Sequence, residues 1–141
     1  MGRFAIPLNL FNWKDTMYTV IPYLYRDAAN HKAHNEIVLS AELNQDEQDL
    51  IRSKLSDGEY FIPGDLVGLH IPELQRRMIG GLSEEDHVFH ELKLDGQELL
   101  EKAPKGATVI PKDAFVAAFC KISGPYGWDI EKCLDRLGIP A

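Results

Sequence analysis

The chain has 141 residues, of which 45% are hydrophobic and 26% are charged, and its formal net charge at pH 7 is −7. This length and apolar content predict one globular domain over residues 1–141 and exclude a disordered chain. The negative charge would repel phosphate backbones, so no direct binding to nucleic acid is expected.

No run approaches the roughly 18 apolar residues of a membrane helix, and Pro7 and Asn9 interrupt the most apolar N-terminal stretch. That stretch lacks the features of a signal peptide, which predicts a cytoplasmic protein without membrane association. Cys120 and Cys133 are thirteen positions apart in separate predicted helices, and we expect reduced, half-buried thiols. No nucleotide-binding or EF-hand motif occurs, and no cofactor is predicted.

Two strands are predicted near the N-terminus. Residues 17–26 are rich in Tyr, Thr, Val and Ile, which favours a strand, and Pro22 within it indicates a sheet edge or a bulge. After a polar connection over residues 27–35, apolar and polar side chains alternate over residues 36–43. This spacing predicts an antiparallel hairpin with a fairly long loop.

A helix is predicted next, because Asn44 and Glu47 have the spacing of a capping box and Gly58 suits its end. Residues 60–82 are expected to be irregular, since Pro and Gly interrupt them repeatedly. A short helix over residues 72–78 is the exception.

The C-terminal half is predicted to hold one strand and two helices. Residues 87–94 alternate before the Asp95–Gly96 turn, which favours a strand, although the acids before them are also typical of a helix start. Helices are expected over residues 111–123 and 129–137, the second capped by Asp129. The resulting fold class is α+β, a small, mainly antiparallel sheet in β-β-α-β-α-α order with helices packed on one face.

The densest group of ligand-type side chains comprises Asp86, His87, His90 and Glu91. Imidazoles and carboxylates bind metals and transfer protons. On a helix, His87 and His90 would share a face and a metal ion, whereas on a strand they point to opposite faces. The predicted strand therefore favours the plainer alternative of one buried, hydrogen-bonded histidine and one exposed histidine.

A second polar group lies on the predicted hairpin loop and contains Asp27, Asn30, His31 and His34. If the fold brought this loop near His87 and His90, the four histidines would be candidate metal ligands. The plainer alternative is a hydrophilic loop without a binding role.

Two aromatic residues, Tyr126 and Trp128, lie on the short connection between the last two predicted helices. Exposed aromatics on a rigid turn are typical interface anchors. Alternatively, Trp128 folds back over the core beside the last helix.

The acidic residues are concentrated in two segments. Residues 42–59 carry six acids against two bases, and residues 84–101 carry seven acids against Lys93. Such segments favour encounter with a basic protein surface. The alternative is that they only keep a small domain in solution.

Three short runs form a recurring pattern: Tyr25-Arg26-Asp27 with Asn30 and Lys32, Phe61-Ile62-Pro63 with Val67-Gly68-Leu69, and Asp86 to Leu92. The pattern covers about residues 17–94 and resembles a family of small proteins of bacterial and phage genomes that has no assigned activity. The resemblance implies no catalytic role. It implies mobile-element biology, in which small acidic proteins act as inhibitors or immunity factors.

The leading hypothesis is a non-enzymatic module that binds a protein partner with a basic surface. Its specific version is a phage or mobile-element inhibitor, such as an anti-defence (anti-CRISPR-like) or immunity protein. The alternative is a small metal-dependent enzyme that uses the cluster from Asp86 to Glu91. A third hypothesis is a homodimer formed through the edge strand that carries Pro22.

Overall fold

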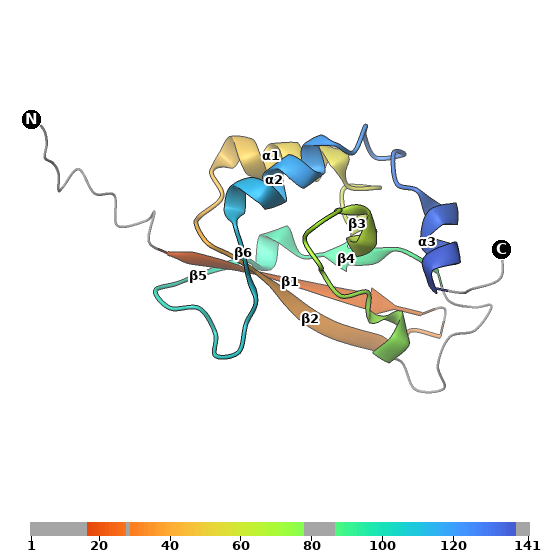
Figure 1. The fold of residues 1–141 in the computed structure, drawn as a ribbon, viewed down its shortest axis with the longest axis horizontal. Helices are drawn as coiled ribbons and strands as arrows, with labels where there is room; N and C mark the ends of the chain where they lie inside the picture. The colour runs from red at the N-terminus through yellow and green to blue at the C-terminus, as the bar shows by residue number, and fades with distance from the viewer. Residues whose placement is uncertain (1–16, 28, 78–86, 138–141) are drawn as a thin grey trace, which may run out of the picture.

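The computed structural model describes residues 17–27, 29–77 and 87–137. Helices α1 (Gln45–Lys54) and α2 (Lys112–Cys120) lie side by side over one face of a twisted sheet, and α3 (Ile130–Leu137) stands at the end toward which β1 runs (Figure 1). The α+β class is therefore confirmed. The sheet itself is mixed, because one of its strand pairs is parallel.

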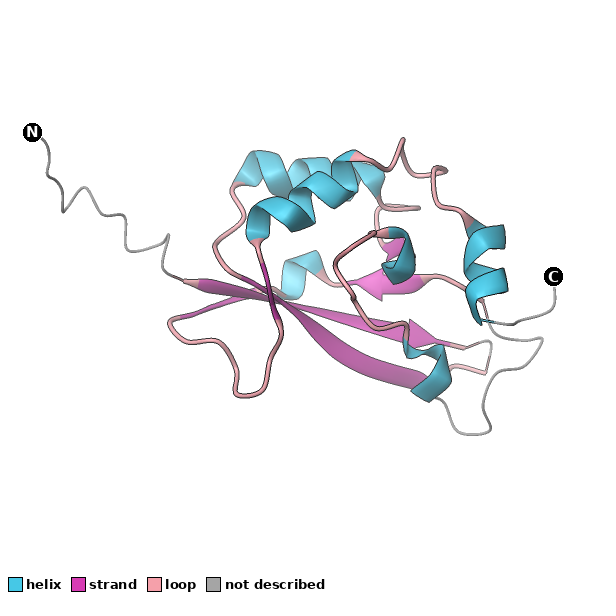
Figure 2. Ribbon diagram, in the orientation of Figure 1, coloured by secondary structure: helices cyan, strands magenta, loops and turns pink. Residues whose placement is uncertain are grey.

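A long hairpin forms the centre of the sheet (Figure 2). Strands β1 (Tyr18–Arg26) and β2 (Lys32–Leu39) pair antiparallel from Thr19 opposite Leu39 to Arg26 opposite Lys32. The hairpin prediction is confirmed, but the predicted boundaries of β2 were wrong. β2 begins at Lys32 because pairing with β1 provides hydrogen-bond partners for the backbone of the polar first half of β2. This tertiary effect outweighs the low local strand propensity of those residues.

Pro22 lies in a central strand, and its predicted position at a sheet edge was wrong. The side of β1 away from β2 pairs with β5 (Glu98–Leu100) near its start and with β4 (His90–Leu92) near its end. Pro22 faces the break between these strands, where its carbonyl accepts a hydrogen bond from the Lys93 N–H at 2.9 Å. The nitrogen of Pro22 faces the same break, so its missing N–H removes no ladder bond.

Several short elements complete the sheet and its connections. β3 (Tyr60–Phe61) extends the sheet beyond β4, and β6 (Val109–Ile110) lies parallel to the end of β2. The 3-10 turns η2 (Pro63–Asp65), η3 (Leu74–Arg77) and η4 (Leu94–Gly96) connect them. Because β3, β5 and β6 were not predicted and the strand expected over residues 87–94 is confined to β4, the stated element order was wrong.

The helix signals were more accurate. Asn44 Oδ1 accepts the Glu47 N–H at 2.8 Å, and Glu47 Oε1 accepts the Asn44 N–H at 2.9 Å, which confirms the capping box. Asp129 Oδ1 accepts the Lys132 N–H at 3.0 Å at the start of α3. The predicted apolar face of α2 is buried in the core, against residues of the sheet and of the helices.

Among the described residues, no helix combines the length and apolar character required to cross a membrane. The apolar N-terminal stretch that contains Pro7 and Asn9, and the candidate site residue Asp86, lie outside the described part of the chain.

Candidate functional site

An open pocket of about 550 Å³ lies where β1, β3 and β4 meet. Its walls come from three separate segments of the chain, the end of β1, the start of β3 and the residues around β4. The lining residues are Arg26, Asp27, Glu59, Tyr60, His87, Phe89 and Glu91. Two of the predicted site residues, His87 and Glu91, therefore meet here.

Glu91, which lines the pocket, forms ion pairs with Arg26 and with Lys93. Arg26 Nε donates to Glu91 Oε2 at 2.9 Å, and Lys93 Nζ donates to Glu91 Oε1 at 2.9 Å. Burial alone would raise the pKa of this carboxyl, but the two cations and their hydrogen bonds lower it to about 2. Glu91 is therefore an ionised carboxylate with a cation on each oxygen, and it is a poor proton acceptor near pH 7.

His87 lies on the rim of the pocket, with both of its ring nitrogens in hydrogen bonds. Its Nδ1 accepts the Phe89 N–H at 3.2 Å, and its Nε2 lies 2.6 Å from the carbonyl oxygen of Arg26. This pairing requires the neutral tautomer with its proton on Nε2. The ring also packs against Tyr25, with centroids 5.0 Å apart. His87 therefore orders the chain before β4 against the end of β1.

The hairpin tip brings Asn30 and His31 close to the same pocket. Asn30 Oδ1 accepts a hydrogen bond from the Arg26 guanidinium, and Asp27 accepts the His31 backbone N–H at 2.8 Å. Burial raises the pKa of the Asp27 carboxyl, but the hydrogen bonds from His31 outweigh this effect and lower it. Asn30 adopts a left-handed φ of 68°, which asparagine tolerates better than most residues. These contacts close the turn and hold Arg26.

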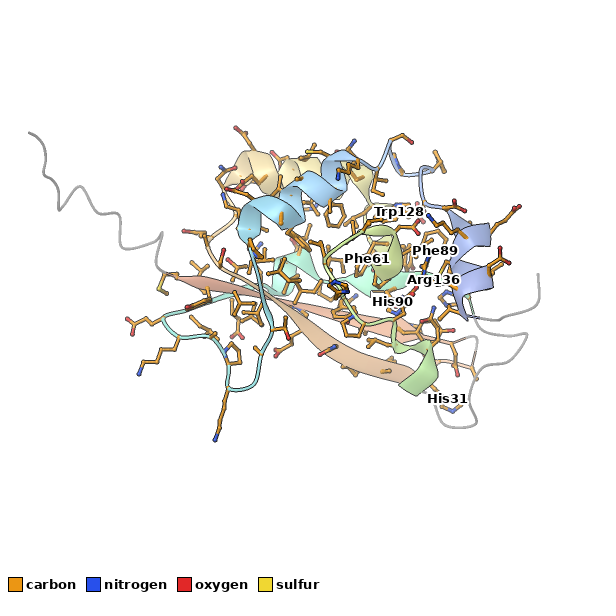
Figure 3. The ribbon with its side chains drawn as sticks, in the orientation of Figure 1. His31, Phe61, Phe89, His90, Trp128 and Arg136 are labelled. Atoms are coloured by element: carbon orange, nitrogen blue, oxygen red, sulfur yellow. The ribbon has the colours of Figure 1, made fainter. Side chains whose placement is uncertain are left out.

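His90 lies in the core, close to Phe61 (Figure 3), and is not among the residues that line the pocket. It has no exposed surface, and its ring is surrounded by Tyr23, Tyr25 and Phe61. Burial lowers the pKa of His90 to about 4, so the imidazole is neutral near pH 7. The sequence-based alternative of one buried and one exposed histidine therefore describes His90 and His87.

The four candidate metal-ligating histidines do not converge. His90 is enclosed in the core, whereas His31 is largely exposed at the hairpin tip (Figure 3). His34 is exposed on β2, and both nitrogens of His87 already have partners. Over residues 17–27, 29–77 and 87–137, no three His, Cys, Asp or Glu side chains form a group suited to hold a metal ion.

The two aromatic residues of the connection between α2 and α3 have opposite environments. Trp128 is 6% exposed and contacts Phe61 and Phe119 edge-on, as in the alternative that placed it over the core (Figure 3). Tyr126 is 96% exposed. The loop of residues 123–129, here called the Tyr126 loop, thus has one side chain buried as an anchor and one presented to solvent.

Hydrogen bonds fix the Tyr126 loop against α1 and η2. Trp128 Nε1–H donates to the Lys54 carbonyl at 2.9 Å, and Lys54 Nζ donates to the Ile122 carbonyl at 2.5 Å. The Asp129 N–H donates to Asp65 Oδ2 at 2.7 Å. The loop therefore adjoins the end of α1, within the acidic segment 42–59.

Sequence reasoning did not identify Arg26 or Tyr60 as parts of the pocket, or Lys93 as an ion-pair partner of Glu91. Arg26 belongs to the Tyr25-Arg26-Asp27 run, for which the resemblance implies no role, and Tyr60 lies in a segment predicted to be irregular. Only the register of β1 and β3 against β4 brings them beside Glu91. The predicted strand over residues 17–26 would place Arg26 and Leu24 on one face, but only the structure shows that Leu24 lies opposite Glu91.

Comparison with known proteins finds no matching protein-family model, curated protein or solved structure.

Proposed function

We propose that this protein is a non-enzymatic binding module that docks onto a basic surface of a partner protein through the Tyr126 loop and the adjoining helix α1. The observation that carries the proposal is the 96% exposure of Tyr126 on a loop held in place by buried Trp128. A rigid, exposed tyrosine provides large contact area at a small cost in conformational entropy.

The charge of the neighbouring helix supports a basic partner. Asp46 and Asp49 are exposed on α1, whereas Glu47 is paired with Lys112 at 2.8 Å. Asp49 lies about 8 Å along the helix axis from Lys54, the residue bonded to the Tyr126 loop. Asp49 accepts a hydrogen bond from Gln45 Nε2 at 2.9 Å and keeps its negative charge exposed. Exposed carboxylates on the helix that adjoins an aromatic anchor attract a basic surface and favour its association at low ionic strength.

The environments of three predicted site residues also favour a binding role over proton transfer. Both ring nitrogens of His87 are in hydrogen bonds, and His90 is buried in the core. The charge of Glu91 is balanced by its ion pairs with Arg26 and Lys93. The more specific proposal, a phage or mobile-element inhibitor or immunity protein, rests on the resemblance of residues 17–94 described above.

Affinity capture from bacterial lysate tests this function. The intact protein is expected to retain a partner at low salt and to release it at high salt. Tyr126→Ala should weaken the affinity for the purified partner by about tenfold or more, the range of an interface hot spot. Asp46→Asn with Asp49→Asn should mainly reduce the salt dependence and the association rate.

The matched control is Glu98→Gln with Glu101→Gln, which removes the same charge from exposed positions at β5 and beyond it. This control should bind as the unmodified protein does. A partner whose retention responds neither to salt nor to Tyr126→Ala would contradict the proposal.

A further inference from the structure

The outer edge of β2 includes a stretch of backbone that pairs with no strand of the described residues. The Ser40 N–H donates to the Ile110 carbonyl at 3.0 Å, so the even-numbered peptide groups of β2 point away from β1. β6 pairs with this edge only at Val38 and Leu39. Among the described residues, no strand continues beside His34 and Glu36, whose backbone groups face the same edge.

A groove of about 420 Å³ runs along this stretch. Its floor is the edge of β2 from Asn35 to Val38, and its walls are the segments 69–72 and 104–108. The chain before β6 turns away from the sheet at Pro104, whose carbonyl accepts the Ala107 N–H at 3.0 Å, and Gly106 has a φ of 79°. This turn leaves the edge open where β6 would otherwise extend.

The groove combines backbone groups with apolar side chains. Ile37, Leu69, Ile71, Ala107 and Ile110 contribute its apolar lining. The lining also contains one acidic residue, Glu36, and one basic residue, Lys105, whose charges are of opposite sign. An occupant would therefore be selected by its extended backbone and apolar side chains, with little contribution from net charge.

We propose that this groove binds an extended, uncharged segment of another protein, rich in β-branched residues, which adds to the sheet in line with β6. The groove is recessed between two loops, which admits a single strand. The edge of a second copy would bring its own flanking loops against them, so a peptide segment fits the recess better than a β2–β2 dimer. This site is separate from the Tyr126 loop, and its binding is expected to be insensitive to salt.

The test uses the intact, isotope-labelled protein and a six-residue peptide that alternates threonine and valine, capped at both ends. The peptide is expected to shift the amide resonances of His34, Glu36 and Ala107 in NMR spectra, equally at low and high salt, and to leave Tyr126 unchanged. The same peptide N-methylated at every residue should bind about tenfold more weakly or worse, because neither of its edges then has an N–H donor to pair with β2.

A protein variant provides the second arm. Glu36→Pro removes an outward N–H that takes no part in the β1 ladder, so the domain should fold and lose peptide binding. Glu36→Ala, which retains the N–H, is the matched control and should bind normally. If Glu36→Pro does not fold, the N-methylated peptide still decides the question.

Three results would overturn the proposal. These are the absence of shifts at millimolar peptide, equal binding of the N-methylated peptide, and slow hydrogen exchange at Glu36 in the free protein. The last result would show that the edge is already occupied, by a second copy if the protein sediments as a dimer and by another part of the chain if it sediments as a monomer.

Discussion

The Nε2 atom of His90 accepts a hydrogen bond from the Leu74 backbone N–H at 2.9 Å. Its Nδ1 lies 3.2 Å from the Val88 carbonyl, which is consistent with a neutral ring protonated on Nδ1. The histidine thus connects η3 to β4 inside the core. It satisfies two backbone groups that would otherwise be buried without partners.

This arrangement predicts that acid weakens the protein through His90. The pKa of His90 is lowered from 6.5 to about 4, so the stability that depends on the neutral ring is present above pH 6.5 and is lost as the pH falls through 4. The loss should reach about 3 kcal/mol. Denaturant unfolding across this range measures it.

His90→Gln should abolish most of that pH dependence, because the side chain no longer titrates. The control is His31→Gln, which changes a histidine that is 74% exposed and should leave the dependence intact. Retention of the full pH slope in His90→Gln would contradict the assignment.

Glu91 should contribute in a lower pH window. Since its pKa is lowered from 4.5 to about 2, its contribution is present above pH 4.5 and is lost as the pH falls toward 2. Glu91→Gln is expected to cost roughly 2 kcal/mol at pH 7, because water partly screens Arg26 and Lys93, which are 39% and 38% exposed.

The matched control for Glu91 is Asp95→Asn, which breaks a pair with Arg52 in which the carboxylate is 99% exposed. This change should cost less than about 0.5 kcal/mol. Chemical denaturation at pH 7 compares the two, and equal losses would show that the Glu91 pairs are also merely surface contacts.

Trp128 is expected to stabilise the fold, whereas Tyr126 is not. Trp128→Phe retains most of the ring contacts but loses the bond to the Lys54 carbonyl, at a cost of about 1 kcal/mol or more. Trp128→Ala should cost about 3–5 kcal/mol.

Tyr126→Ala, at an exposed site, should change the free energy of unfolding by less than about 0.5 kcal/mol. A large loss on Tyr126→Ala would mean that Tyr126 supports the fold instead of awaiting a partner.

The two thiols should differ in reactivity. Cys120 is exposed, whereas Cys133 is buried and donates to Glu73 Oε2 at 3.0 Å. Burial and the nearby carboxylate raise the pKa of Cys133, so its thiolate is scarce. An aromatic disulfide reagent should therefore label one thiol in the folded protein and both after unfolding. Cys120→Ser should abolish the labelling of the folded protein, and rapid labelling of that variant would contradict the buried placement of Cys133.

Local chemistry was sufficient to predict the helices and the hairpin. The capping residues Asn44 and Asp129 act within one turn of their own positions, so their roles do not depend on distant segments. The apolar spacing of α2 likewise determines which of its side chains are buried. The alternation over residues 87–94 places Val88, His90 and Leu92 on one side, and all three are buried, although Glu91 on the other side is buried as well.

The tertiary structure decided the sheet and the sites. β3 and β6 have two residues each, too few to show a period, and they form because longer strands provide their partners. Pro22 indicated an edge, but only the break between β4 and β5 allows it in a central strand. The separation of Tyr126 from Trp128 also depends on distant residues, since Lys54, Phe61 and Phe119 provide the contacts that bury one ring and leave the other exposed.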